Sequence, residues 1–170
     1  MDCGKKRLTQ CKRLPFVIGF TGSTCDSGWF EVDDSCFRVF AGTSVAKEWE
    51  EAREFCLQQG SDLAVVDSET ERKIIGDHLT NISNKYPDDN INAFIGIRKF
   101  STWHWLDGSN VSASIWHYGF PWFWARGECG LLEKGWWWWS LDWKLSHWPC
   151  QWYSGFICET DQRKSFFTIN

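Results

Sequence analysis

Apolar residues recur every three or four positions in the stretch that follows Ser44, with acidic residues between them. This period is typical of an amphipathic helix that buries one stripe of side chains. Ser44 has a side chain that can cap such a helix, and Gly60 has the backbone freedom to end it. We therefore expect a first helix between these two residues. Its buried stripe consists of Val45, Trp49, Ala52 and Cys56.

A second helix is indicated by the capping box that Ser68 and Glu71 can form. In this motif each of the two side chains binds a backbone N–H of the other residue. Apolar residues follow at helical spacing, so the pattern predicts a helix over residues 69 to 80. Residues 81 to 92 are polar and are expected to form a loop.

From residue 93 onward, stretches of alternating apolar and polar residues are separated by turn residues, which is typical of β-strands. A turn at Asp33-Asp34-Ser35 separates two further predicted strands near the start. The predicted strands cover residues 28 to 32, 36 to 40, 93 to 98, 102 to 106, 129 to 132, 136 to 145 and 153 to 159.

The chain has eight cysteines at uneven spacing: Cys3, Cys11, Cys25, Cys36, Cys56, Cys129, Cys150 and Cys158. An even number of cysteines in a small protein favours a disulfide framework, which persists in an oxidising compartment. No pair has the Cys-x-x-Cys spacing of a zinc knuckle or a redox dithiol. We therefore expect an extracellular protein, either secreted or the ectodomain of a membrane protein.

The length of 170 residues suits one domain. The net charge is -4, and basic and acidic residues are interspersed along the chain. A protein that binds nucleic acid or anionic lipid would be expected to have a concentrated basic region, which this sequence does not show. No apolar run approaches the ~20 residues of a membrane-spanning helix. Nucleic acid is therefore not an expected partner, and a membrane would be reached only through an anchor outside this sequence.

The sequence divides into a basic lead (residues 1 to 24), one domain (25 to 159) and a short tail (160 to 170). Within the lead, the apolar run 14 to 20 precedes small residues near Ser23, as in a short secretory signal. If the signal is removed, six cysteines remain. If the lead is retained, Cys3 and Cys11 can close a small loop of their own.

One ordered set of residues identifies a family. It comprises Trp49-x-x-Ala52-x-x-x-Cys56, Gly60, Leu63, Ser68-x-x-Glu71, Phe94-Ile-Gly-Ile97, Trp103-x-Trp105-x-Asp107-Gly108-Ser109, Trp116-x-x-Gly119-x-Pro121, Cys129, Cys150 and Phe156-Ile-Cys158-Glu159. This set resembles the C-type lectin-like domain, in the long form that has an N-terminal hairpin disulfide. The resemblance covers residues 25 to 159.

The resemblance implies a disulfide-bonded α+β fold in which two helices flank small antiparallel sheets and a long loop holds the ligand site. It also implies three disulfides, Cys25–Cys36, Cys56–Cys158 and Cys129–Cys150.

In calcium-binding members of that family, oxygen ligands come from a Glu-Pro-Asn or Gln-Pro-Asp triplet, a nearby Glu and a Trp-Asn-Asp triplet. Here the corresponding triplets are Phe120-Pro121-Trp122, with an implied cis bond before the proline, and Leu145-Ser146-His147. Of the neighbouring carboxylates, only Glu128 and Asp142 remain. Because Ca²⁺ takes six to eight oxygen ligands, we expect no calcium at this site and no cofactor.

Tryptophan is unusually frequent, with 14 in the chain. Five of them, Trp29, Trp49, Trp103, Trp105 and Trp116, occupy positions that fill the core in the family. The other nine lie between residues 122 and 152. In a strand, Trp136 to Trp139 would face both sides, so some rings are expected to be exposed. The predicted ligand-binding residues are Trp122, Trp124, Trp137, Trp139, Trp143 and His147. The alternative is a buried aromatic cluster that stiffens the long loop in place of calcium.

These observations indicate an extracellular, non-catalytic recognition module that binds a protein or a glycan without calcium. Exposed indoles can stack on sugars, and they are also common anchors of protein interfaces. A calcium-dependent carbohydrate-binding lectin is the alternative.

Two further hypotheses use histidines. A zinc site would combine His104, His117 and His147 with Glu128, and a metal-dependent hydrolase would combine His147, Glu128 and Asp142. The hydrolase lacks a nucleophile–base pair, so we expect no enzyme. Asn81 and Asn110 begin glycosylation sequons, the first in the predicted polar loop and the second after a turn.

Overall fold

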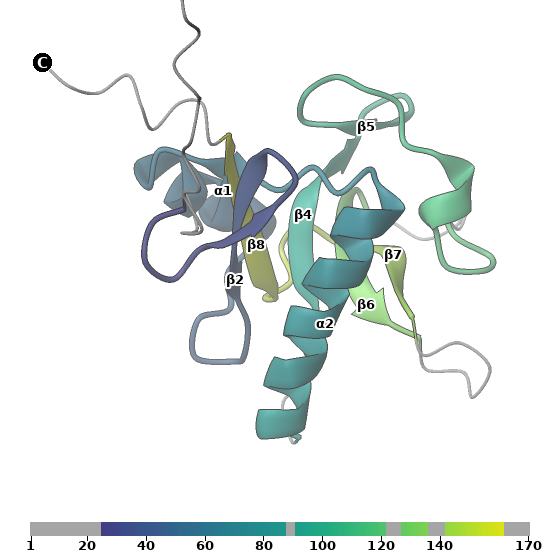
Figure 1. Cartoon of the computed structure of the whole chain (residues 1–170). Helices are drawn as coiled ribbons and strands as arrows, with labels where there is room; N and C mark the ends of the chain where they lie inside the picture. Colours follow the sequence, from purple (N-terminus) through teal and green to yellow (C-terminus); the bar gives the residue numbers. More distant parts are fainter. Residues whose placement is uncertain (1–24, 88–90, 122–126, 136–141, 162–170) are drawn as a thin grey trace, which may run out of the picture.

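The structure is a computed structural model that describes residues 25–87, 91–121, 127–135 and 142–161 (Figure 1). The elements are β1 (Phe30–Val32), β2 (Ser35–Phe40), α1 (Trp49–Gln58), β3 (Asp62–Leu63), α2 (Glu69–Lys85), β4 (Ala93–Lys99), β5 (Trp103–Trp105), η1 (Ala113–Ile115), β6 (Cys129–Lys134), β7 (Trp143–Trp148) and β8 (Gly155–Asp161). None of the helices in these ranges is long and apolar enough to cross a membrane. The predicted loop between Cys3 and Cys11 lies outside the described residues.

The strands form one mixed sheet of eight strands rather than separate small antiparallel sheets. Its order is β1-β2-β8-β4-β6-β7, with β3 added beside β8 and β5 beside β4. The pair β4–β8 is parallel, and the other pairs are antiparallel. The reason is that β8 inserts between β2 and β4 and hydrogen-bonds to both, which joins the N-terminal hairpin to the strands that follow the second helix.

Each face of the sheet carries one helix and one apolar core. Along β4, Ile95 and Ile97 pack with Ile75 and Leu79 of α2, whereas Phe94 packs with residues of α1. This division follows from the two-residue period of a strand. Figure 1 shows α2 in front of the sheet and α1 behind it. The expectation of two flanking helices is therefore confirmed.

Helix α1 begins later than its periodicity predicts. Its N-cap is Glu48, which makes no side-chain capping bond, so the prediction that Ser44 caps the helix is wrong. The backbone is still extended at Lys47, whose N–H and C=O both pair with Ser154 (2.9 and 3.0 Å). This pairing with a distant segment delays the helix, and Val45 lies outside it with 36% of its surface exposed.

Helix α2 begins as predicted and ends later. The Ser68 hydroxyl accepts from the Glu71 N–H at 3.0 Å, and the Glu71 carboxylate accepts from the Ser68 N–H at 3.3 Å, which confirms the capping box. The helix continues to Lys85 because Ile82 extends its apolar stripe against the core. Asn81 therefore lies on the helix and not in a loop.

Near the C-terminus, the predicted strand over residues 136 to 145 overlaps the start of β7 (Trp143–Trp148), which continues to Trp148, and residues 136–141 lie outside the described ranges.

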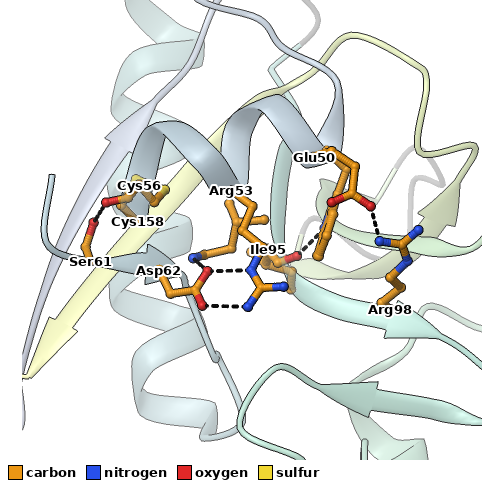
Figure 2. A network of polar contacts seen from close by, with 10 residues as sticks. Glu50, Arg53, Cys56, Ser61, Asp62, Ile95, Arg98 and Cys158 are labelled. Atoms are coloured by element: carbon orange, nitrogen blue, oxygen red, sulfur yellow. Dashed lines mark hydrogen bonds and ion pairs between the residues drawn. A yellow bond between two sulfur atoms is a disulfide. The ribbon is translucent and has the colours of Figure 1, made fainter. Parts of the chain in front are cut away.

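Side chains fasten α1 to the sheet (Figure 2). The Trp49 indole N–H donates to the Ile95 carbonyl at 2.9 Å, and the Arg53 guanidinium binds both oxygens of Asp62 at 3.0 and 3.1 Å. Arg98 of β4 pairs with Glu50. All three disulfides implied by the resemblance are present: Cys25–Cys36, Cys56–Cys158 and Cys129–Cys150.

Candidate functional site

The two triplets that correspond to the calcium ligands of the family meet in the structure. The bond from Phe120 to Pro121 is cis, as the resemblance implies. The second triplet lies in β7, where Leu145 pairs with Leu132 and His147 pairs with Gly130 of β6. The Phe120 and His147 rings are 5.3 Å apart at an angle of 74°. The meeting point of the triplets is therefore an edge-to-face aromatic contact.

Two tryptophans complete this contact, and we call Trp103, Trp116, Phe120 and His147 the ring cluster. The Trp103 ring lies 5.1 Å from that of Trp116 and 5.2 Å from that of His147. Trp116 and His147 are buried, and the cluster joins the core on the α2 face. Aromatic contacts of this kind contribute about 0.5–1.5 kcal/mol each beyond the burial of their area.

The ring cluster offers no set of carboxylate oxygens for a hard cation. Ser146 has the one side-chain oxygen of the second triplet, and strand alternation directs it to the face opposite His147. Glu128 precedes β6, whereas Asp142 lies at the far end of the β6–β7 ladder, where its carbonyl accepts from the N–H of Gly135 (3.2 Å). At about 3.3 Å per residue, the ladder separates these two carboxylates too widely for one ion.

Burial lowers the pKa of His147 below its ordinary value, and the positive charge of Lys99 lowers it further. A hydrogen bond with the Gly127 backbone acts in the opposite direction. The imidazole is therefore neutral at pH 7, as its place among apolar rings requires.

This pKa makes stability depend on pH. Because the unfolded chain takes up the proton at about pH 6.5 and the folded state resists it, the free energy of unfolding is expected to fall as pH drops below about 6.5. His147→Phe is expected to remove this component of the pH dependence. Urea denaturation of both proteins between about pH 5 and 8 measures the difference.

Glu71 and Glu159, whose pKa values burial raises, remain in both proteins and cancel in the comparison. An unchanged pH dependence in the variant would contradict the assignment to His147.

The nine tryptophans between residues 122 and 152 divide into three groups. Six of them lie outside the described residues: Trp122, Trp124, Trp136, Trp137, Trp138 and Trp139. Trp143 is buried against α2, where its indole N–H donates to the Thr80 hydroxyl at 2.8 Å. Trp148 and Trp152 stack on each other with centroids 4.8 Å apart.

The prediction that Trp143 and His147 belong to an exposed ligand surface is wrong. Both are buried and lie on the same face of β7, because residues two or four apart in a strand share a face; Trp143 packs on α2 and His147 packs in the ring cluster. Trp148 lies on the other face, and Trp152 is 54% exposed. The same alternation could have identified Trp148 from the sequence. It directly follows His147 in the strand and therefore faces the opposite side of the sheet. The five tryptophans expected in the core are confirmed as packing there: Trp49, Trp105 and Trp116 are buried, and Trp29 and Trp103 are partly buried.

The family model of the lectin C-type domain matches residues 45–160. The chain belongs to the C-type lectin family.

Three known proteins show how close this C-type lectin is to others. The C-type lectin lectoxin-Phi1 of Philodryas olfersii is 32% identical over 115 residues, which cover 64% of this chain and 69% of that protein. The secretory phospholipase A2 receptor of Bos taurus is 27% identical over 165 residues, covering 86% of this chain and 10% of that much longer protein. The solved structure of the SPL-1 - GlcNAc complex superposes with a TM-score of 0.67 at 25% identity, over 81% of this chain and 95% of that chain.

The histidines of the zinc hypothesis make contacts with other groups. The His104 Nε2 contacts the Thr102 hydroxyl at 2.6 Å, and the His117 Nε2 contacts the Glu133 carbonyl at 2.9 Å. Within the described ranges, no three His, Cys, Asp or Glu side chains are placed to hold a metal ion. The geometry therefore does not bring together the zinc set of His104, His117, His147 and Glu128, nor the hydrolase set of His147, Glu128 and Asp142.

Both sequon asparagines of this C-type lectin are exposed. Asn81 lies on the surface of α2, and Asn110 lies in the loop after β5, where it forms a β-bridge with His104. Glycosylation at both asparagines stays a prediction.

Proposed function

We propose that this C-type lectin is an extracellular, non-catalytic recognition module that binds its ligand without calcium. The observation that carries the proposal is the ring cluster, in which Phe120 and His147 occupy the two triplets that supply calcium ligands elsewhere in the family. The packed rings hold the two segments together, so no ion is needed for that purpose. Three disulfides support an extracellular location.

The ligand is a protein or a carbohydrate, recognised through exposed tryptophan rings of residues 122 to 152. Large exposed aromatic side chains are characteristic of binding surfaces. Trp152 is one such ring among the described residues. We include Trp122, Trp124, Trp137 and Trp139 in the proposed surface on the basis of the sequence. The SPL-1 structure is a complex with GlcNAc, which supports a sugar as one candidate ligand.

Calcium is expected to leave the stability of the folded protein unchanged. A calcium site with a dissociation constant of about 10 µM would raise the free energy of unfolding by about 2.7 kcal/mol at about 1 mM calcium, through mass action. We expect no such rise in urea denaturation with calcium compared with EDTA.

Two matched variants sharpen this test. Glu128→Gln and Asp142→Asn remove the remaining carboxylates near the triplets, and both residues are exposed. Neither variant is expected to change the response to calcium. A stabilisation by calcium that disappears in either variant would refute the proposal and favour the calcium-dependent alternative.

A further inference from the structure

A second candidate site lies on the face of the sheet that carries α1, opposite the ring cluster. A cavity of about 300 Å³ opens on this face, next to the segment that precedes α1. Phe94 of β4 and Leu131 of β6 form its floor, and both belong to the core on the α1 side. Trp148, Trp152 and Tyr153 line the same cavity. The site is therefore separated by the sheet from the triplets of the family's calcium site.

The aromatic wall of this cavity consists of parallel rings. The Trp148 and Trp152 planes are inclined by only 20°, with centroids 4.8 Å apart. Trp148 is half-buried, whereas Trp152 and Tyr153 are 54% and 68% exposed. Trp148 covers one face of the Trp152 ring. The opposite face of Trp152 is the one available to a ligand.

The segment that carries these rings is held at both ends. At one end, Cys150 is bonded to Cys129 of β6. At the other end, Ser154 pairs with Lys47 through two backbone hydrogen bonds of 2.9 and 3.0 Å. The Trp152 N–H also donates to the Pro149 carbonyl at 3.0 Å, which closes a turn between the two ends. A wall fixed in this way loses little conformational freedom when a ligand binds.

Polar groups stand beside the rings. Glu133, Asn92 and Thr43 line the cavity, and one Glu133 oxygen accepts from the Trp148 indole N–H at 3.4 Å. A carboxylate has two oxygens and about four acceptor positions, so acceptor capacity remains for a ligand. An amide and a hydroxyl add groups that can both donate and accept.

Resting on the proposed calcium-independent recognition, we propose that this cavity binds one saccharide ring. A pyranose has C–H bonds on its face and hydroxyls on its edge. Its C–H face suits the electron-rich face of Trp152, and its hydroxyls suit Glu133, Asn92 and Thr43. The volume is at the lower end of the range for small-ligand pockets, whereas a stable protein interface covers about 800 Å² per partner. The size and the mixture of groups therefore favour a sugar over a protein.

The test is a titration of the whole chain with N-acetylglucosamine, galactose and mannose in EDTA, followed by the ¹H–¹⁵N signals of the tryptophan indoles. Trp148→Phe and Trp152→Phe assign the two signals of the wall. We expect at least one sugar to shift both signals. Trp152→Ala is expected to weaken binding about tenfold, the value of one aromatic contact. Tyr153→Ala, at the same rim, is a second variant that should also weaken binding.

Phe100→Ala is the matched control, because Phe100 is 72% exposed and is not part of the cavity wall. This variant is expected to bind as the wild type does, and the thermal midpoints of all variants verify that they fold. Sugar binding that is unchanged in both Trp152→Ala and Tyr153→Ala would overturn the cavity as the site and leave calcium-independent recognition standing. If no sugar shifts either signal, the saccharide assignment is refuted. Binding that requires calcium would instead refute the proposed function.

Discussion

Replacement of Cys56 and Cys158 by alanine is expected to lower the free energy of unfolding by about 5 kcal/mol. The two cysteines are 102 residues apart in the sequence, so their bond closes a loop that contains most of the domain. A crosslink over a long loop removes the most conformational entropy from the unfolded chain. Both side chains are also fully buried and join α1 to β8 at the centre of the core on the α1 side. Guanidinium denaturation of the wild type and the double variant measures this loss.

The matched control is the double variant Cys25→Ala and Cys36→Ala. This disulfide spans only 11 residues, and its removal is expected to cost about 3 kcal/mol. Both double variants lack one disulfide and keep the other two, so they differ mainly in loop length and, secondarily, in the burial of Cys25. Equal losses in the two variants would contradict the argument from chain entropy.

Trp49→Ala is expected to cost about 3–5 kcal/mol of stability, as is usual for removal of a large buried aromatic side chain. No part of Trp49 is exposed, and its indole N–H donates to the Ile95 carbonyl at 2.9 Å. The guanidinium of Arg98 lies 5.2 Å from the ring centroid, which adds a cation–π contact. The substitution leaves a void between α1 and β4. Urea denaturation measures the change.

Trp152→Ala provides the contrast for Trp49, since more than half of the Trp152 surface is exposed. Its cost is expected to be about 1 kcal/mol, mainly from the loss of its stacking contact with Trp148, and so well below that of Trp49→Ala. A large loss of stability in Trp152→Ala, or a small one in Trp49→Ala, would contradict the division of the tryptophans into core and surface groups. The same pair of variants separates stability from ligand binding, because Trp152→Ala is expected to weaken sugar binding while costing much less stability than Trp49→Ala.

Sequence patterns correctly predicted those helices and strands whose conformation depends on residues nearby in the chain. The capping box of Ser68 and Glu71 places the start of α2 correctly, since it needs only residues within one helical turn. The apolar run Phe94 to Ile97 likewise predicts β4, because a strand that is buried on both faces is apolar at consecutive positions. The disulfide pairs were implied by the family resemblance of the ordered cysteines and tryptophans, and the structure contains all three.

Errors arose where a distant segment sets the local conformation. Ser44 is a residue type that commonly caps helices. The bridge between Lys47 and Ser154 nevertheless keeps the backbone extended, so α1 starts only at Trp49. Trp143 is a residue type that is common in ligand-binding surfaces. Pairing of β7 with β6 nevertheless directs its side chain against α2. The periodicity of a segment does not reveal which distant segment pairs with it, here Ser154 with Lys47 and β6 with β7.

The sequence by itself determined the family and the two helices, because these follow from residue types at a given order and spacing. Resemblance to that family then implied the disulfide pairs and showed that the triplets Phe120-Pro121-Trp122 and Leu145-Ser146-His147 lack the carboxylates of the calcium ligands. Only the tertiary structure decided which rings are buried and which are exposed. The decisive event is the pairing of β6 with β7, which directs His147 into the ring cluster and the adjacent Trp148 to the opposite face. The cavity on the α1 face of the sheet depends on strand alternation, the Cys129–Cys150 disulfide and the Lys47–Ser154 bridge, which bring Trp148 and Trp152 together there.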